Sequence, residues 1–260
     1  MRREAAAVDS ATMRLLAPIG RTFFAIGMIA FGVLHVLRAD FVTRLVPTPR
    51  AAIPGRAALA VVVGLFLIAA GAAILARKLV RPATLALAGA LFLSVAAIYL
   101  PRLLSHFAWG DVLTNTLKIA ALGGGALAVA RSVPGGKELP PVGRFLLAAF
   151  LIVCGIEHFL FVQFVATLVP AWMPGHVFWT YFTGTALVAG GVGLLAPPTA
   201  RLAATLSGAM IFLWVWMVHL PRALAPGAPL LETAGVFEAL SLSGVALVLA
   251  ATPWPARPAR

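Results

Sequence analysis

The chain has 260 residues, of which 62% are hydrophobic and 11% charged, and its mean hydropathy is +1.01. Soluble domains are about half apolar and a quarter charged, so this composition excludes a water-soluble globular protein and predicts a polytopic membrane protein. The net charge of +12 comes from short basic clusters between apolar runs. Such clusters favour topology signals and lipid head-group contacts over nucleic-acid binding.

Apolar runs follow one another from residue 20 to residue 250. A hydrocarbon core of ~30 Å needs about 20 helical residues to cross it. We expect spans near 20–38, 56–76, 81–101, 111–130, 143–168, 176–196, 201–220 and 232–250. Backbone polar groups in lipid must be satisfied inside the protein, and no alternating barrel pattern is present, so the expected fold is all-α with eight transmembrane helices.

The basic residues of the loops predict the orientation of the chain. Thirteen Lys and Arg residues lie on the side of both termini and six on the other, while Lys118 lies inside a span. The positive-inside rule therefore predicts that both termini are cytoplasmic, with an N-terminal segment at 1–19 and a tail at 251–260. The segment 38–56 is also basic and is the exception to this pattern.

The chain repeats itself over more than a hundred residues. His35 matches His158 at an offset of 123, and the Leu-Pro-Arg at 100–102 matches the one at 220–222 at an offset of 120. Other pairs at these offsets are Gly20 and Gly143, Gly32 and Gly155, Gly64 and Gly184, and Gly71 and Gly191. We expect two four-span bundles, 20–130 and 143–250, joined by a cytoplasmic linker at 131–142. Because four spans return the chain to its starting side, the bundles should be parallel repeats.

Three matched pairs differ in chemical type. They are Leu34 and Glu157, Tyr99 and His219, and Lys118 and Glu238. Ionisable side chains are costly in lipid, so they normally face a bundle interior, pair with one another or line a site. The single cysteine, Cys154, excludes an intrachain disulfide, so redox chemistry would require a bound cofactor or quinone.

The ionisable residues of the second unit lie at similar depth. A rise of 1.5 Å per residue puts His158 roughly 22 Å and His219 roughly 27 Å from the cytoplasmic end, and Glu238 roughly 9 Å below the outer end. We therefore expect a ligand-binding pocket in the outer half of the second bundle. Its candidate members are Glu157, His158, His219, Arg222 and Glu238. The pocket requires His158, His219 and Glu238 to point towards one interior space.

Several chemistries fit such a pocket. A His–Glu cluster relays protons, two histidines on facing helices ligate haem b, and histidines also hydrogen-bond the carbonyl groups of a quinone. Arg222 would hold an anionic group. Haem is the less favoured cofactor, because isolated histidine pairs on separate spans are common without haem. The sequence has no metal-ligand spacing, hydrolase triad or nucleotide-binding loop, so no metal site is expected and no catalytic residue is identified.

Simpler interpretations of the same residues stay open. His35 and His158 would serve as structural donors between helices, and Glu157 and Glu238 would satisfy each other's surroundings or be protonated in apolar burial. Leu-Pro-Arg would mark the end of a span, with the arginine reaching the head groups.

The second unit resembles the DoxX-like family of small bacterial membrane proteins. The resemblance rests on "EH" at 157–158, "VPAWMPG" at 169–175, "FW" at 178–179 and "HLPR" at 219–222. The first unit resembles a diverged copy that lacks the tryptophan after Val-Pro and has Tyr99 in place of the histidine. The resemblance implies four-span bundles in the bacterial inner membrane, sometimes as subunits of quinone-reducing or other redox systems with a partner subunit.

Three hypotheses about function follow. The first is a redox-associated membrane protein with a quinone-like or small lipophilic ligand near His158, His219 and Glu238. The second is a carrier or permease, which two parallel repeats would suit, although no evidently broken helix lies at the midplane of either unit. The third is a scaffold or assembly subunit without chemistry of its own, which short loops and many packing glycines permit. The expected partners are the lipid bilayer and a redox partner subunit, with no nucleic acid.

Overall fold

The structure is a computed structural model that describes residues 2–47, 53–136 and 138–252. Within these residues all regular structure is helical, and eight helices are long and apolar enough to cross a membrane. The spans are Leu15–Arg38, Arg56–Leu75, Val80–Ser105, Val112–Arg131, Val142–Leu160, His176–Leu195, Ala200–Leu224 and Leu230–Ala251. The expected all-α fold is confirmed, and the chain is a multi-pass membrane protein.

The first half of the chain contains α1 to α5 and the second half α6 to α11. The first-half helices are α1 (Arg2–Arg38), α2 (Arg56–Leu75), α3 (Val80–Ser94), α4 (Leu100–Ser105) and α5 (Val112–Arg131). Those of the second half are α6 (Val142–Leu160), α7 (Val162–Ala166), α8 (His176–Leu195), α9 (Ala200–Trp214), α10 (Leu220–Leu224) and α11 (Leu230–Ala251). Two π-helical segments, η1 (Val95–Tyr99) and η2 (Val215–His219), join α3 to α4 and α9 to α10.

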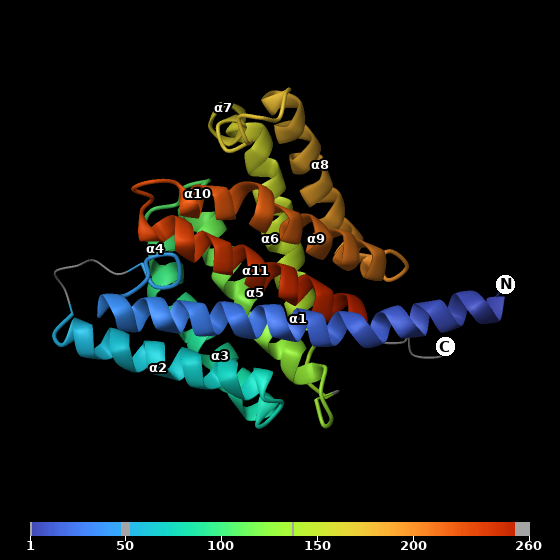
Figure 1. The fold of residues 1–260 in the computed structure, drawn as a ribbon, viewed down its shortest axis with the longest axis horizontal. Helices are drawn as coiled ribbons and strands as arrows, with labels where there is room; N and C mark the ends of the chain where they lie inside the picture. The colour runs from blue at the N-terminus through green and yellow to red at the C-terminus, as the bar shows by residue number, and fades with distance from the viewer. Residues whose placement is uncertain (1, 48–52, 137, 253–260) are drawn as a thin grey trace.

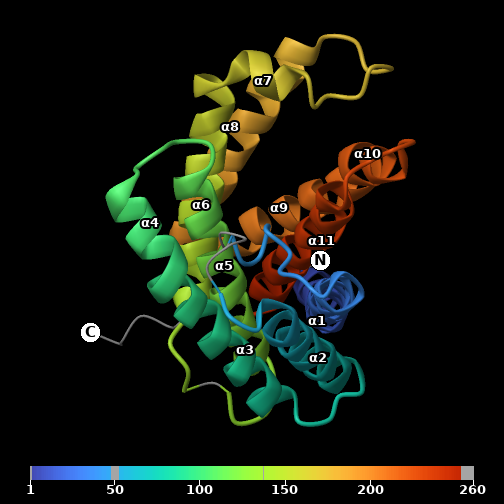
Figure 2. The same cartoon turned by 90° about the vertical axis from the view of Figure 1, so that its left-hand side faces the viewer.

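Helices of the two halves pack against one another, so the halves do not form separate bundles. The first helix, α1, lies along both α2 and the last helix, α11, as Figure 1 shows. The first helix of the second half, α6, packs against α8 and against α5, the last span of the first half. The spans of α5 and α11 are the most buried, at 72% and 83% of their apolar windows, so these two helices form the centre of the molecule. Figure 2 shows α6 and α8 diverging from α10 and α11 on either side of α5.

Glycines permit the closest helix contacts, and they do so at corresponding positions in both halves. A Cβ at Gly64 would lie 2.7 Å from the carbonyl oxygen of Gly32, between α2 and α1. A Cβ at Gly155 would lie 2.7 Å from the carbonyl oxygen of Gly184, between α6 and α8. Small residues let helix backbones approach in lipid, where dispersion contacts replace the hydrophobic effect between helices.

The Leu-Pro-Arg segments continue the third and seventh spans instead of ending them. A proline ring clashes with the carbonyl four residues earlier, which is Ala97 for Pro101 and Met217 for Pro221. Both carbonyls lie inside π-helical segments, where Leu100 donates its N–H to the carbonyl of Val95. The wider π turn relieves the clash, so the helix continues as far as residue 105 or 224. The interpretation of Leu-Pro-Arg as a span end was therefore wrong by one turn of helix.

Other boundaries differ from the sequence-based expectation. The fifth span is Val142–Leu160, shorter than the expected 143–168, because the backbone leaves the helix at Phe161 (φ −119°, ψ 39°) before the short α7. Residues 2–19 continue the first span as helix. Among the cations that predict orientation, Arg50, Lys137, Arg257 and Arg260 lie outside the described residues, as does the tail from residue 253.

Candidate functional site

A buried ion cluster connects the two halves at the centre of the molecule. Glu238 on α11 accepts a hydrogen bond from Arg44 Nη1 at 2.8 Å on one carboxylate oxygen, and its other oxygen lies 3.0 Å from Lys118 Nζ on α5 in an ion pair. The side chains of Glu238 and Lys118 are only 7% and 10% exposed. Lys118 and Glu238 occupy matched positions 120 residues apart, so the change of charge between the halves produces the pair. Two cations share one carboxylate here, which makes Glu238 the residue that holds the cluster together.

Glu157 has a separate, local set of partners. Its Oε1 accepts the backbone N–H of Gly110 at 2.9 Å, and Thr114 Oγ1 donates to the same oxygen. Gly110 and Thr114 flank the beginning of α5, whose helix dipole favours a negative charge at that end. The hydrogen bonds of Glu157 therefore connect α6 to the first turn of α5.

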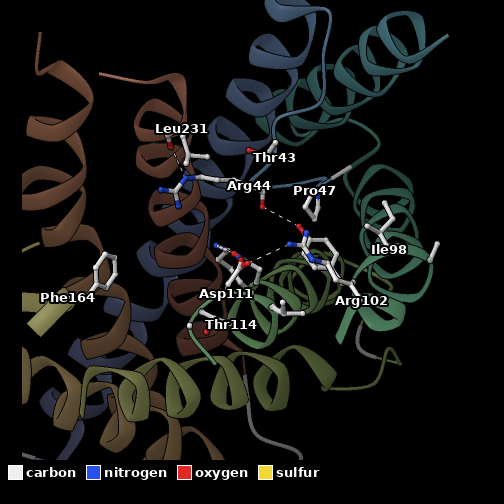
Figure 3. Close-up of a pocket in the computed structure, with 15 residues that line it drawn as sticks. Thr43, Arg44, Pro47, Ile98, Arg102, Asp111, Thr114, Phe164 and Leu231 are labelled. Atoms are coloured by element: carbon white, nitrogen blue, oxygen red, sulfur yellow. Dashed lines mark hydrogen bonds and ion pairs between the residues drawn. The ribbon is translucent and has the colours of Figure 1, made fainter. Parts of the chain in front are cut away.

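A polar cavity of about 1020 Å³ lies beside the ion cluster, between the segment after α1, η1, α4 and the start of α5 (Figure 3). Arg44, turned towards Leu231, and Arg102, turned towards Asp111, line two sides of it, and Lys118 also lines it. Arg102 Nη2 lies 3.7 Å from Asp111 Oδ2 in a pair that is half exposed, so it adds little stability. This cavity combines three cations with one lining carboxylate.

An apolar cavity of about 340 Å³ lies in the second half, between α6, α8, α9 and η2. Its apolar walls include three aromatic residues and three methionines: Trp179, Phe182, Trp214, Met173, Met210 and Met217. Three basic side chains also line it, namely His158, His219 and Arg222. Cavities of this size with apolar walls and a few convergent polar groups are typical of small-molecule sites.

The basic side chains of the apolar cavity have different partners. His158 Nδ1 hydrogen-bonds the carbonyl of Cys154 at 2.7 Å, which leaves Nε2 for a ligand. Arg222 Nη2 donates to Glu232 Oε1 at 2.8 Å. The imidazole of His219 forms no hydrogen bond with the described residues, so it is the cavity's most available polar group.

His219 also connects the two cavities. A Cβ at Gly235 would lie 3.3 Å from His219 Nδ1 and 3.2 Å from Arg44 Nη2. Only a glycine on α11 leaves room for both groups to approach its Cα. His219 therefore faces the apolar cavity on one side and the Arg44–Glu238 pair on the other.

The structure divides the five residues expected to form one pocket. His158, His219 and Arg222 line the apolar cavity together, whereas Glu157 and Glu238 are absent from its lining. Glu157 turns to the start of α5, and Glu238 turns to Lys118 and Arg44. The expectation of one interior space shared by His158, His219 and Glu238 fails at Glu238, because its carboxylate pairs with cations of the first half.

Two contributors were missed from the sequence. Arg44 lies in the basic segment 38–56, the exception to the charge pattern of the loops, and nothing local marks it as a partner of Glu238. Glu232, the partner of Arg222, lies in the first turn of α11, and no sequence pattern assigns it a role. The sequence did single out Lys118, because it lies at the repeat position that matches Glu238 and has the opposite charge.

The region that builds the apolar cavity also carries the similarity to a known family. Residues 147–228 match a domain of unknown function, DUF8561. The match covers every residue that lines the apolar cavity, which runs from His158 to Arg222. No DoxX-like family matches the chain. No curated protein and no solved structure matches it either.

Tyr99, at the position matched to His219, has a structural role. Tyr99 is 1% exposed, and its hydroxyl donates to the carbonyl of Leu45 at 3.2 Å. We expect Tyr99→Phe to lower the free energy of unfolding by about 1 kcal/mol, because a buried carbonyl loses its donor. Unfolding in mixed detergent micelles measures the change. Unaltered stability would show that Tyr99 contributes packing alone.

Proposed function

We propose that the protein binds a small lipophilic molecule with a carbonyl-bearing head, of which a quinone is the model, in the apolar cavity of its second half. The observation that carries the proposal is the convergence of His158, His219 and Arg222 on an otherwise apolar space of about 340 Å³. Apolar walls accept a ring and tail, and His219 has the hydrogen-bonding capacity to donate to a carbonyl. The redox association and the bacterial inner-membrane location, with cytoplasmic termini, rest on the resemblance to DoxX-like proteins and on the loop charges.

The duplication supports the same choice of site. The π segments lie 120 residues apart, and the glycine contacts fall at the offsets of 120 and 123. We propose two units, 20–130 and 143–250, that diverged after duplication. Tyr99 in the first unit also lines a cavity, but its hydroxyl is already bonded to the carbonyl of Leu45, whereas His219 has no such partner among the described residues, so we assign ligand binding to the second unit.

Equilibrium binding of decylubiquinone to the detergent-purified protein tests the proposal. We expect saturable binding that weakens roughly tenfold in His219→Ala, through loss of one hydrogen bond. Val218→Phe should also weaken binding, because a larger side chain fills the cavity. His106→Ala is the matched control, since this exposed histidine lies outside the lining. Binding that is unsaturable, or equal in all four proteins, would contradict the proposal.

A carrier function is the second candidate, and one observation favours it. The polar cavity of about 1020 Å³ reaches Lys118 inside a span, and the neighbouring third span contains the π segment η1. π segments are frequent at functional sites and interrupt regular helix hydrogen bonding. Uptake of a polar solute into proteoliposomes that is lost in Lys118→Met would favour the carrier over the lipophilic-ligand hypothesis. Absence of both uptake and quinone binding would favour a scaffold subunit.

A further inference from the structure

A third cavity, of about 470 Å³, lies at the opposite end of the spans from the two cavities above. It is bounded by the beginning of the first span, by the turn between α2 and α3, and by the linker between the two halves. Three arginines line it, namely Arg21 on α1, Arg77 in the turn and Arg81 on α3. The lining contains no Asp or Glu.

The three guanidinium groups have no protein partner in the described part of the chain. No hydrogen bond or ion pair joins the guanidinium group of Arg21, Arg77 or Arg81 to another described residue. Like charges that converge on one hollow repel one another unless an anion lies between them. The arrangement therefore leaves three planar donors available to one negatively charged group.

The beginning of α3 adds backbone donors to the same cavity. This fifteen-residue helix begins at Val80, directly beside the cavity, and has no capping side chain. Leu79, the residue before it, adopts the left-handed conformation (φ 52°). The first N–H groups of a helix have no intrahelical acceptor, and the helix dipole favours an anion at this end.

The linker between the two halves lies against one of the arginines, Arg81. Gly135 has φ 77°, and a Cβ there would lie 3.0 Å from Arg81 Nη1. Val133 and Pro134 form the neighbouring wall. The cavity is thus bounded by protein on the linker side, and it lies at the end of apolar helices, where phospholipid head groups are found.

The position in the second half that matches Arg21 is buried and has a protein partner. Arg144, which lies 123 residues after Arg21, is 3% exposed and donates to the carbonyl of Thr252 at 3.4 Å. The hollow beside it measures only about 10 Å³. Pro197 stands at the position matched to Arg77. Among the described residues, the open cavity lined by three arginines therefore occurs in the first half, and its matched position in the second half does not reproduce it.

We propose that this cavity binds a phosphate group, supplied by the head group of an anionic phospholipid. Arg21, Arg77 and Arg81 neutralise the phosphate from three sides, and the N–H groups of Val80 and Arg81, at the start of α3, complete the site. The proposal is independent of the quinone-like ligand, because the two cavities lie at opposite ends of the spans and share no residue.

Delipidated protein in a non-ionic detergent provides the test, with binding of phosphatidylglycerol, phosphatidylcholine and inorganic phosphate measured separately. We expect phosphatidylglycerol to bind more tightly than phosphatidylcholine. Its binding should weaken roughly a hundredfold in the triple variant Arg21→Gln/Arg77→Gln/Arg81→Gln. Lys78→Gln is the matched control, because this exposed cation neighbours Arg77 but does not line the cavity.

The outcomes separate the sources of the phosphate. Binding of inorganic phosphate with the same arginine dependence, and without binding of the lipid, would support a phosphate site and overturn its assignment to a head group. If the triple variant fails to fold, the single variant Arg77→Gln, in an exposed turn, should bind phosphatidylglycerol about fivefold more weakly than the parent protein. Equal binding by the parent and by the folded arginine variants, or no binding by any, would overturn the proposal.

Discussion

Replacing Glu238 by Gln should destabilise the protein by about 3–5 kcal/mol, which is the range for removing one partner from a buried ion pair. The substitution leaves Lys118 and Arg44 beside each other with no carboxylate, in the most buried part of the molecule. Lys118→Met should cost less, because Glu238 then keeps Arg44. Unfolding in mixed detergent micelles gives the order of the two effects.

The double variant Lys118→Met/Glu238→Gln makes the test sharper. We expect it to be less destabilised than the sum of the single variants, because contacting charges couple energetically. Arg102→Gln is the control, since its half-exposed pair with Asp111 should contribute at most about 1 kcal/mol. Additive single effects, or a larger loss in Arg102→Gln than in Glu238→Gln, would show that the central cluster does not join the two halves.

The second large effect is expected at Gly244, where α11 meets α1. A Cβ there would lie 2.5 Å from the carbonyl oxygen of Gly20 and 2.7 Å from the amide nitrogen of Phe24. Both are backbone atoms, so only a separation of the two helices relieves the clash. Gly244→Val should therefore destabilise the fold by about 3 kcal/mol, at the upper end of the usual cost of overpacking.

Gly89→Ala is the matched control for Gly244→Val. A Cβ at Gly89 meets nothing within 4 Å, so the substitution should stabilise α3 slightly, because alanine is the better helix former. The same unfolding assay compares the two variants. If Gly244→Val proves no worse than Gly89→Ala, the close packing of the first helix against the last would be refuted.

The sequence predicts the spans well because their signal is local. Eight apolar runs with polar ends specify eight helices, and the predicted and observed boundaries differ by only a few residues at most ends. The larger differences have local physical causes that hydropathy does not record. The π segments accommodate Pro101 and Pro221, so two spans are longer than predicted. The break in the helix at Phe161 makes another span shorter than predicted.

The site is predicted only in part because span prediction does not specify helix rotation or partners. His158 and His219, which the sequence places at similar depth, line one cavity together with Arg222. Glu238 has similar depth but faces the other half, because α1 and α11 pack together across the repeat boundary. Arg44 reaches it from a loop nearly two hundred residues away in sequence, which no local pattern records.

Photoaffinity labelling of the membrane-embedded protein with an azido-quinone tests the central claim most directly. The account predicts adducts on peptides that line the apolar cavity, such as those containing Trp179, Trp214 or Met217, and suppression of these adducts by excess decylubiquinone and by His219→Ala. Adducts spread over the outer faces of the spans, with no competition by decylubiquinone, would contradict a ligand site in the second half.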